Sequence, residues 1–192
     1  GGLDVSHEVS YGTGESSLNY VITRNNISNN ADGGIYLYVE ASTGDIDHSV
    51  VIRGNVLEGN DPGGGQIVMF ASDLMDTDGS YDLDFDMGHP NAFGYNTIVA
   101  DGDNPSSWSV SFFQVVSGNS VVTADLNAVG NWWGTQDAGV IEDRVYHGPD
   151  SSGSFTANLS NPLADALTYS ISQPGNKVRL TAGDGSGFVP YA

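Results

Sequence analysis

The stretch Asn19–Ser42, NYVITRNNISNNADGGIYLYVEAS, returns 30 residues later as Ser49–Ser72, SVVIRGNVLEGNDPGGGQIVMFAS. The residues shared at this offset include Ile22 with Ile52, Asn25 with Asn55, Asn30 with Asn60, and Gly33-Gly34 with Gly63-Gly64. Each unit has an apolar run, a turn around Asn, a Gly-rich corner and a second apolar run. A period near thirty residues that restores the same residue types to the same phase indicates that units of the chain stack on one another.

An Asn-x-aliphatic pattern marks the turn in four such units. The asparagines are Asn25, Asn55, Asn96 and Asn127, and the steps between them are 30, 41 and 31 residues. Stacked units would place these side chains about 4.8 Å apart, where their amides can form a hydrogen-bonded ladder. The alternative is that Asn is only a good turn residue, because it tolerates left-handed backbone. Both interpretations make these asparagines structural.

The apolar runs are short, rich in Val, Ile and Tyr, and lack helical spacing, which is typical of strands. Units of this length without an intervening helix predict an all-β chain, a short parallel β-helix (solenoid) of about four coils in which each strand pairs with its counterpart one coil away. Residues 1–163 are predicted to form the coils and their closing segment. Residues 164–192 are predicted to form a terminal β-hairpin and a linker.

The first residues of the chain match the middle of a unit, because Gly1-Gly2-Leu3 resembles Gly33-Gly34-Ile35. The chain is therefore expected to begin in mid-coil and to leave a row of strand N–H and C=O groups exposed. We expect this open coil to pair with the rest of a larger polypeptide or with another chain.

The formal net charge is −19, from 24 Asp and Glu residues against 5 Lys and Arg residues. Such a chain repels nucleic acid and anionic lipid and attracts cations. The excess of acids fits either a surface that works at high salt or one bathed in Ca²⁺. No apolar stretch is long enough to span a membrane, and the absence of cysteine excludes thiolate metal sites.

The 41-residue step predicts an insertion between residues 73 and 90, read as an Asp-rich loop. Its candidate metal ligands are Asp76, Asp78, Asp82, Asp84 and Asp86. Clustered carboxylates suit Ca²⁺, and the Asp76-Thr77-Asp78-Gly79 run resembles part of a Ca²⁺ loop, although Met87 stands where an EF-hand has its bidentate Glu. The alternative is an ordinary half-exposed strand in which Leu83, Phe85 and Met87 face inward and the acids face water.

The segment Asn131-Trp132-Trp133-Gly134-Thr135-Gln136-Asp137, with Ile141, Tyr146 and Asn161-Pro162-Leu163 after it, resembles the closing segment of right-handed parallel β-helix repeat proteins of the pectate-lyase-like superfamily. The match covers about a fifth of the chain. The resemblance implies a right-handed coil, a short capping helix over residues 138–146, and extracellular or cell-surface modules linked to carbohydrate. It brings no catalytic residues.

The tryptophans have two interpretations. Trp132 and Trp133 can cover the open end of the stack, or, with Trp108, they can bind carbohydrate by stacking on sugar rings. The histidines at positions 7, 48, 89 and 147 lack metal spacing and are predicted to lie at the surface.

Three functions remain open. The preferred one is a non-catalytic extracellular module of a larger cell-surface or secreted protein, which binds cations, with Ca²⁺ as cofactor, and carbohydrate. The second is a fragment of a polysaccharide lyase or hydrolase that uses Asp84, Asp86 or Asp101. The third is a structural subunit that self-assembles through its open coil.

Overall fold

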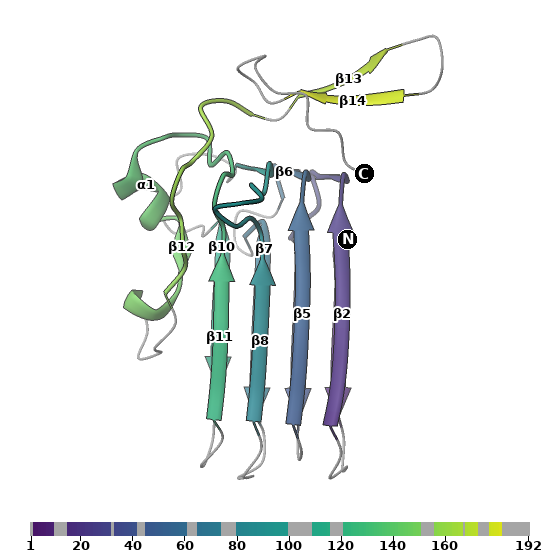
Figure 1. Cartoon of the computed structure of the whole chain (residues 1–192), viewed down its shortest axis with the longest axis vertical. Coiled ribbons are helices and arrows are strands. Elements are labelled where there is room, and N and C mark those ends of the chain that lie inside the picture. Colours follow the sequence, from purple (N-terminus) through teal and green to yellow (C-terminus); the bar gives the residue numbers. More distant parts are fainter. Residues whose placement is uncertain are drawn as a thin grey trace.

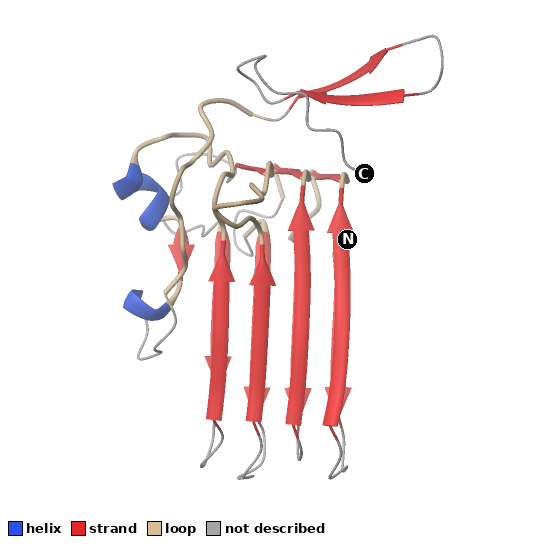
Figure 2. Cartoon of the chain, in the orientation of Figure 1, coloured by secondary structure: helices blue, strands red, loops and turns tan. Residues whose placement is uncertain are grey.

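The structure is a computed structural model that describes residues 2–9, 15–31, 33–41, 45–60, 65–73, 80–99, 109–115, 121–150, 156–166, 168–172 and 177–181. Strands dominate it (Figures 1 and 2). They form a five-stranded sheet, a four-stranded sheet, a three-stranded sheet and a two-stranded hairpin.

The three larger sheets are parallel, and neighbouring strands in each come from successive repeats. The five-stranded sheet has the order β1 (Leu3–Val9), β4 (Ile35–Ala41), β7 (Ile67–Asp73), β10 (Val110–Val115), β12 (Val145–Tyr146). The four-stranded sheet has the order β2 (Glu15–Thr23), β5 (Asp45–Arg53), β8 (Ser80–Asp86), β11 (Val121–Asn127). The three-stranded sheet has the order β3 (Asn26–Ser28), β6 (Val56–Glu58), β9 (Thr97–Val99).

The prediction of one right-handed parallel β-helix of about four coils is wrong. Across the described ranges, the strands form separate small parallel sheets, and no sheet closes or curls into a single solenoid. The physical reason lies at the turns. Arg24 and Gly54, which follow β2 and β5, both have positive φ, so the chain changes direction there and the strands before and after each turn belong to separate sheets.

The register shows where the longer repeat absorbs its extra residues. The offset between paired residues is 30 for β2 with β5, because Glu15 pairs with Asp45, and 32 for β4 with β7, because Ile35 pairs with Ile67. It is 35 for β5 with β8, because Ile46 pairs with Tyr81. It reaches 41 at Asn55 and Asn96. The largest share of the surplus therefore falls after Asp86, and not in a single loop between residues 73 and 90.

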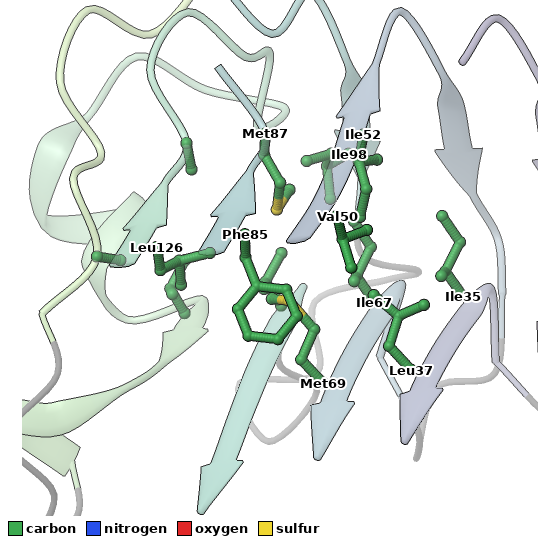
Figure 3. Close-up of a cluster of buried hydrophobic side chains, with 14 of the residues drawn as sticks. Ile35, Leu37, Val50, Ile52, Ile67, Met69, Phe85, Met87, Ile98 and Leu126 are labelled. Atoms are coloured by element: carbon green, nitrogen blue, oxygen red, sulfur yellow. The ribbon is translucent and has the colours of Figure 1, made fainter. Parts of the chain in front are cut away.

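The core lies between the sheets (Figure 3). Side chains on alternate strand positions fill it, and the largest fully buried ones are Trp133, Phe85, Ile35, Leu37, Ile52, Leu57, Ile67, Met69, Leu83, Met87 and Ile98. Because every second residue of a strand points to the same face, this alternation leaves the opposite face of each sheet to solvent. The core therefore fixes which residues each sheet displays.

Asparagine side chains connect the repeats at the turn before the three-stranded sheet. Asn25 donates both its backbone N–H and its Nδ2–H to Asn55 Oδ1, at 2.9 and 3.0 Å. Asn55 donates in the same way to Asn96 Oδ1, at 2.9 and 3.1 Å. Asn96 continues to Asn131 Oδ1, at 3.0 and 2.8 Å. We call Asn25, Asn55, Asn96 and Asn131 the Asn ladder.

The predicted fourth rung, Asn127, is not part of the Asn ladder. Asn127 is the last residue of β11 and pairs with Asp86 of β8. Asn131 takes the place instead, because it has the same phase as Asn96, as the parallel bridge between Thr97 and Trp132 shows. In the ladder the residue two positions after Asn points inward, and in the last rung that residue is Trp133, which is fully buried.

One side of the molecule is covered by the closing segment, residues 131–150 and 156–163 (Figure 1). Its helix α1 spans Ala138–Glu142, shorter than the predicted 138–146, and Asp137 caps it by accepting hydrogen bonds from the N–H groups of Gly139 and Val140. Asn158 forms a parallel bridge to Asn127, and Leu163 N–H donates to Asn131 C=O at 2.9 Å. The short 3-10 helix Gly148–Asp150 lies in the same segment.

The hairpin near the C-terminal end consists of β13 (Thr168–Ser172) and β14 (Lys177–Thr181), which pair antiparallel. No helix among the described residues has the length and hydropathy needed to cross a membrane.

Candidate functional site

Three of the five predicted metal ligands lie on a central strand and not on a loop. Asp82, Asp84 and Asp86 belong to β8, which pairs with β5 on one side and β11 on the other. Leu83 and Phe85 are buried between them, whereas Asp82 and Asp84 are exposed and Asp86 is half-buried. The loop prediction was wrong for these residues, because the alternation of apolar and acidic residues is that of a strand with one buried face. Asp76 and Asp78 lie outside the described residues.

The strand register adds two acids that sequence reasoning missed. Asp47 of β5 pairs with Asp82, and Asp125 of β11 pairs with Asp84. Both are exposed. We call these five residues, Asp47, Asp82, Asp84, Asp86 and Asp125, the acidic face. Asp47 and Asp125 could have been found from the sequence by aligning the alternating apolar residues of β5, β8 and β11, because paired positions must share a face.

Asp84 lies at the centre of the acidic face, and the repulsion among these carboxylates affects its pKa. Asp84 is exposed, but its partial desolvation at the sheet surface raises the pKa of its carboxyl above the ordinary value of 3.8. The charges of Asp86, Asp125, Asp82 and Asp47 raise this pKa further, in that order of importance. Each cause disfavours the ionised form. The acidic face therefore holds more negative charge than its own surroundings neutralise.

Asp47 Oδ2 accepts a long hydrogen bond from Ser17 Oγ at 3.4 Å, but Asp86 is the member of the acidic face with close partners. Its Oδ2 forms an ion pair with the Arg53 guanidinium, and its Oδ1 accepts a hydrogen bond from Gly88 N–H at 2.9 Å. Its carboxylate therefore fixes the turn that follows β8. Asp86 is less available to an added ligand than Asp47, Asp82, Asp84 and Asp125.

The geometry does not provide a closed metal cage. No group of three or more His, Asp or Glu side chains in the described part of the chain is placed to hold one metal ion. Neighbouring strands of a sheet lie about 4.8 Å apart, and Ca²⁺ binds oxygens at about 2.3–2.6 Å. Two paired carboxylates, such as those of Asp84 and Asp125, can thus reach one ion whose remaining ligands are water.

Of the predicted carbohydrate-binding tryptophans, the structure describes Trp132 and Trp133. Trp133 is fully buried in the core, so the prediction that it stacks on a sugar ring is wrong. Trp132 is half-buried and extends the three-stranded sheet, because its N–H donates to Asn96 C=O at 2.8 Å and its C=O accepts from Ile98 N–H at 2.8 Å. Trp108 lies outside the described residues, and so does Asp101, which the enzyme interpretation used.

Two histidines predicted to lie at the surface are buried. His48 is 1% exposed, and its ring packs edge-on against Tyr20 and Phe85. His147 is also 1% exposed; its Nε2 lies 2.8 Å from Glu142 Oε1, and its Nδ1 accepts a hydrogen bond from Ala157 N–H at 2.9 Å. Imidazole can satisfy its polar atoms inside a core when partners are present. His147 thereby joins the two parts of the closing segment.

Comparisons of the chain with protein-family models, with curated proteins and with solved structures found no match.

Proposed function

We propose that this chain is a non-catalytic extracellular or cell-surface module that binds divalent cations, Ca²⁺ above all, on its acidic face. The observation that carries the proposal is the position of Asp84 among four other carboxylates, with its pKa raised by partial desolvation and by their charges. A bound cation relieves that repulsion and favours the ionised form of all five groups.

The expected affinity is modest. Pairs of carboxylates on adjacent strands supply few protein oxygens per ion, and Ca²⁺ sites in extracellular modules bind with Kd values of about 0.1–1 mM. With a Kd of about 1 mM, 10 mM Ca²⁺ stabilises the folded state by about 1.4 kcal/mol. For a chain of this size, that corresponds to a rise in Tm of about 3–5 °C.

The test compares two triple variants with equal charge change. The first, Asp47→Asn/Asp84→Asn/Asp125→Asn, removes three charges from the acidic face. The control, Glu58→Gln/Asp143→Asn/Asp165→Asn, removes three charges from exposed residues elsewhere in the structure. Thermal melts are recorded with Ca²⁺, with chelator, and with NaCl at matched ionic strength.

We expect the wild type and the control variant to gain stability with Ca²⁺ and the acidic-face variant to lose most of that gain. The proposal fails if the acidic-face variant responds like the control. It also fails if NaCl at matched ionic strength reproduces the whole effect of Ca²⁺, because the cation then acts by screening alone.

Carbohydrate binding is part of the proposal through the cation. Because Trp133 is buried, the acidic face is the better candidate for contact with an acidic polysaccharide, with Ca²⁺ bridging the two sets of carboxylates. Affinity electrophoresis in gels containing polygalacturonate should show retardation with Ca²⁺ and none with chelator. Retardation that is independent of Ca²⁺ would contradict the bridging mechanism.

A second candidate is a polysaccharide hydrolase or lyase fragment. The observation that favours it is again Asp84, because a carboxyl with a raised pKa beside ionised carboxylates is the arrangement that glycosidases use for acid catalysis. Reducing-sugar and unsaturated-product assays on acidic and neutral polysaccharides test it. Turnover that disappears in Asp84→Asn would establish the enzyme, and absence of turnover would leave the binding function.

A further inference from the structure

The three parallel sheets all begin on the same side of the molecule. β1, β2 and β3 are each the first strand of their sheet, and no described strand pairs with their outer edges. We call these strands, Leu3–Val9, Glu15–Thr23 and Asn26–Ser28, the open edge. In Figure 1, β2 lies at one margin of its sheet, opposite the margin covered by the closing segment.

The Asn ladder has a direction, and it ends at the open edge. Asn55 Oδ1, Asn96 Oδ1 and Asn131 Oδ1 each accept two hydrogen bonds from the Asn of the preceding repeat. Asn25 is the first rung, and no Asn of an earlier described repeat donates to its Oδ1, which is the atom that the pattern of the other rungs assigns to the next donor. A second, shorter ladder repeats the pattern, because Asn30 donates its N–H and Nδ2–H to Asn60 Oδ1 at 3.1 and 2.9 Å.

The donors of each rung also reach backward. Asn55 Nδ2 donates to Ile22 C=O at 2.8 Å, Asn96 Nδ2 donates to Ile52 C=O at 2.8 Å, and Asn131 Nδ2 donates to Met87 C=O at 2.8 Å. Each of these carbonyls belongs to the preceding repeat. Asn25 Nδ2 donates to Thr23 C=O at 3.1 Å within its own turn, as Asn55 Nδ2 does to Arg53 C=O at 3.3 Å. The first rung thus differs from the others in lacking the hydrogen bond to a carbonyl of an earlier repeat.

We propose that the open edge is a docking surface for a partner segment of polypeptide that forms one more repeat of the same type and bears Asn at the two ladder positions. The incoming Asn residues donate their N–H and Nδ2–H groups to Asn25 Oδ1 and Asn30 Oδ1. Three strands of the partner add in parallel to β1, β2 and β3, which is strand addition at a sheet edge.

A second copy of this chain does not meet these requirements. In a two-fold dimer both copies present the same edge. The acceptor oxygens of Asn25 and Asn30 in one copy would then face the same acceptor oxygens in the other copy, and no Asn turn would donate to them. In a head-to-tail arrangement the open edge meets the closing segment, where Leu163 N–H and Asn158 already occupy the ends of the ladder and of the four-stranded sheet. The partner must therefore supply a repeat whose Asn side chains point outward as donors.

The test inserts a copy of residues 15–44 between residues 14 and 15. Glu15 and Asp45 are in register, so the junction from residue 44 to residue 15 reproduces the native junction from residue 44 to residue 45. The matched control carries Asp in place of Asn at both ladder positions of the copy only, because Asp has nearly the same shape but only acceptor atoms.

We expect the Asn copy to raise Tm by about 4 °C or more and to slow hydrogen exchange of the outward amides of β2 and β3 about tenfold or more. The Asp copy should do neither. An equal gain from both copies, or a folded chain in which the inserted residues and the open edge exchange freely, would overturn the proposal.

An insertion that prevents folding altogether is covered by a second measurement on the unmodified protein. The capped peptide of residues 15–41 is titrated into it, and the side-chain amide signals of Asn25 and Asn30 are followed by NMR. We expect these signals to shift with the Asn peptide and not with its Asp counterpart. No shift at millimolar peptide would overturn the proposal, and neither experiment depends on cation binding by the acidic face.

Discussion

Replacing Asn96 with Ala should destabilise the protein far more than replacing Asn25, the exposed first rung of the Asn ladder. Asn96 is fully buried, and its side chain satisfies groups on both neighbouring repeats. Its Oδ1 accepts from Asn55 N–H at 2.9 Å, and its Nδ2 donates to Ile52 C=O at 2.8 Å. Alanine leaves both of these buried backbone groups without a partner.

The size of the effect follows from those two groups. A buried polar group that loses its partner costs about 1–3 kcal/mol, so Asn96→Ala should lower the free energy of unfolding by about 4 kcal/mol. The control is Asn25→Ala. Asn25 is exposed and gives up only Nδ2 hydrogen bonds to Asn55 Oδ1 and Thr23 C=O, so its loss should cost about 1 kcal/mol or less.

Urea unfolding with linear extrapolation measures both values. Asn96→Asp adds a further comparison, because it keeps the shape and the acceptor for Asn55 but turns a carboxylate oxygen toward Asn131 Oδ1 and Ile52 C=O. We expect it to be no better than Ala. The reasoning is refuted if Asn96→Ala costs the same as Asn25→Ala, or if Asn96→Asp is tolerated, since filling space would then matter more than hydrogen bonding.

Three further predictions test other parts of the structure. The carboxyl of Asp84 holds its proton more tightly in the folded state because its pKa is raised. The free energy of unfolding should therefore fall as pH rises from about 3.8 through that raised pKa. Asp84→Asn should raise Tm at pH 7 by about 1 °C, and Glu58→Gln is the control. Gly94→Ala should lower the free energy of unfolding, measured in urea, by about 3 kcal/mol or more, because the added Cβ would lie 1.8 Å from Met87 O. The control Gly139→Ala, on the exposed helix, should change it by about 1 kcal/mol at most. His147→Ala should lower the free energy of unfolding by about 3 kcal/mol, because it leaves a cavity and removes the acceptor of the buried Ala157 N–H. The control Glu142→Gln changes the exposed side of the same contact and should cost less than about 1 kcal/mol. Equal costs would show that His147 does not anchor the closing segment.

The strands and their pairing between repeats were within reach of sequence reasoning, because the phase of Ile22, Asn25, Ile52 and Asn55 follows from one offset. The arrangement of the sheets was not. A repeat of strands and turns says which strands pair, but it does not say whether the sheets that result join into one closed coil. That depends on the turns, where residues such as Arg24 take positive φ against their usual preference.

The last rung of the Asn ladder, Asn131, was missed because Trp133 and not an aliphatic residue stands two positions after it. The pattern searched was Asn followed two positions later by an aliphatic residue, and Asn127 with Val129 satisfied it. In the structure the inward position after the fourth Asn is filled by Trp133, a larger side chain at the end of the core. A search for any large apolar residue at that position would have offered Asn131 as well.

The acidic face was predicted in part. Asp82, Asp84 and Asp86 stood out because they are close in the sequence, and the alternative of a half-exposed strand described their burial correctly. Asp47 and Asp125 come from other repeats, and only the strand register brings them beside the first three. Proximity along the chain therefore found the residues of one strand and missed those that pairing adds.

The Asn ladder keeps nearly the same hydrogen-bond lengths over unequal lengths of chain. The two bonds measure 2.9 and 3.0 Å where 30 residues separate the asparagines, and 2.9 and 3.1 Å where 41 residues separate them. The distance between neighbouring rungs of the Asn ladder therefore does not depend on the number of residues between them. Evolution can lengthen or shorten a connection without disturbing the hydrogen bonds to the neighbouring repeats. The same property makes the exposed turn of residues 89–91, between Asp86 and Asn96, a natural position for grafting foreign sequence, because the native chain already accommodates extra residues there.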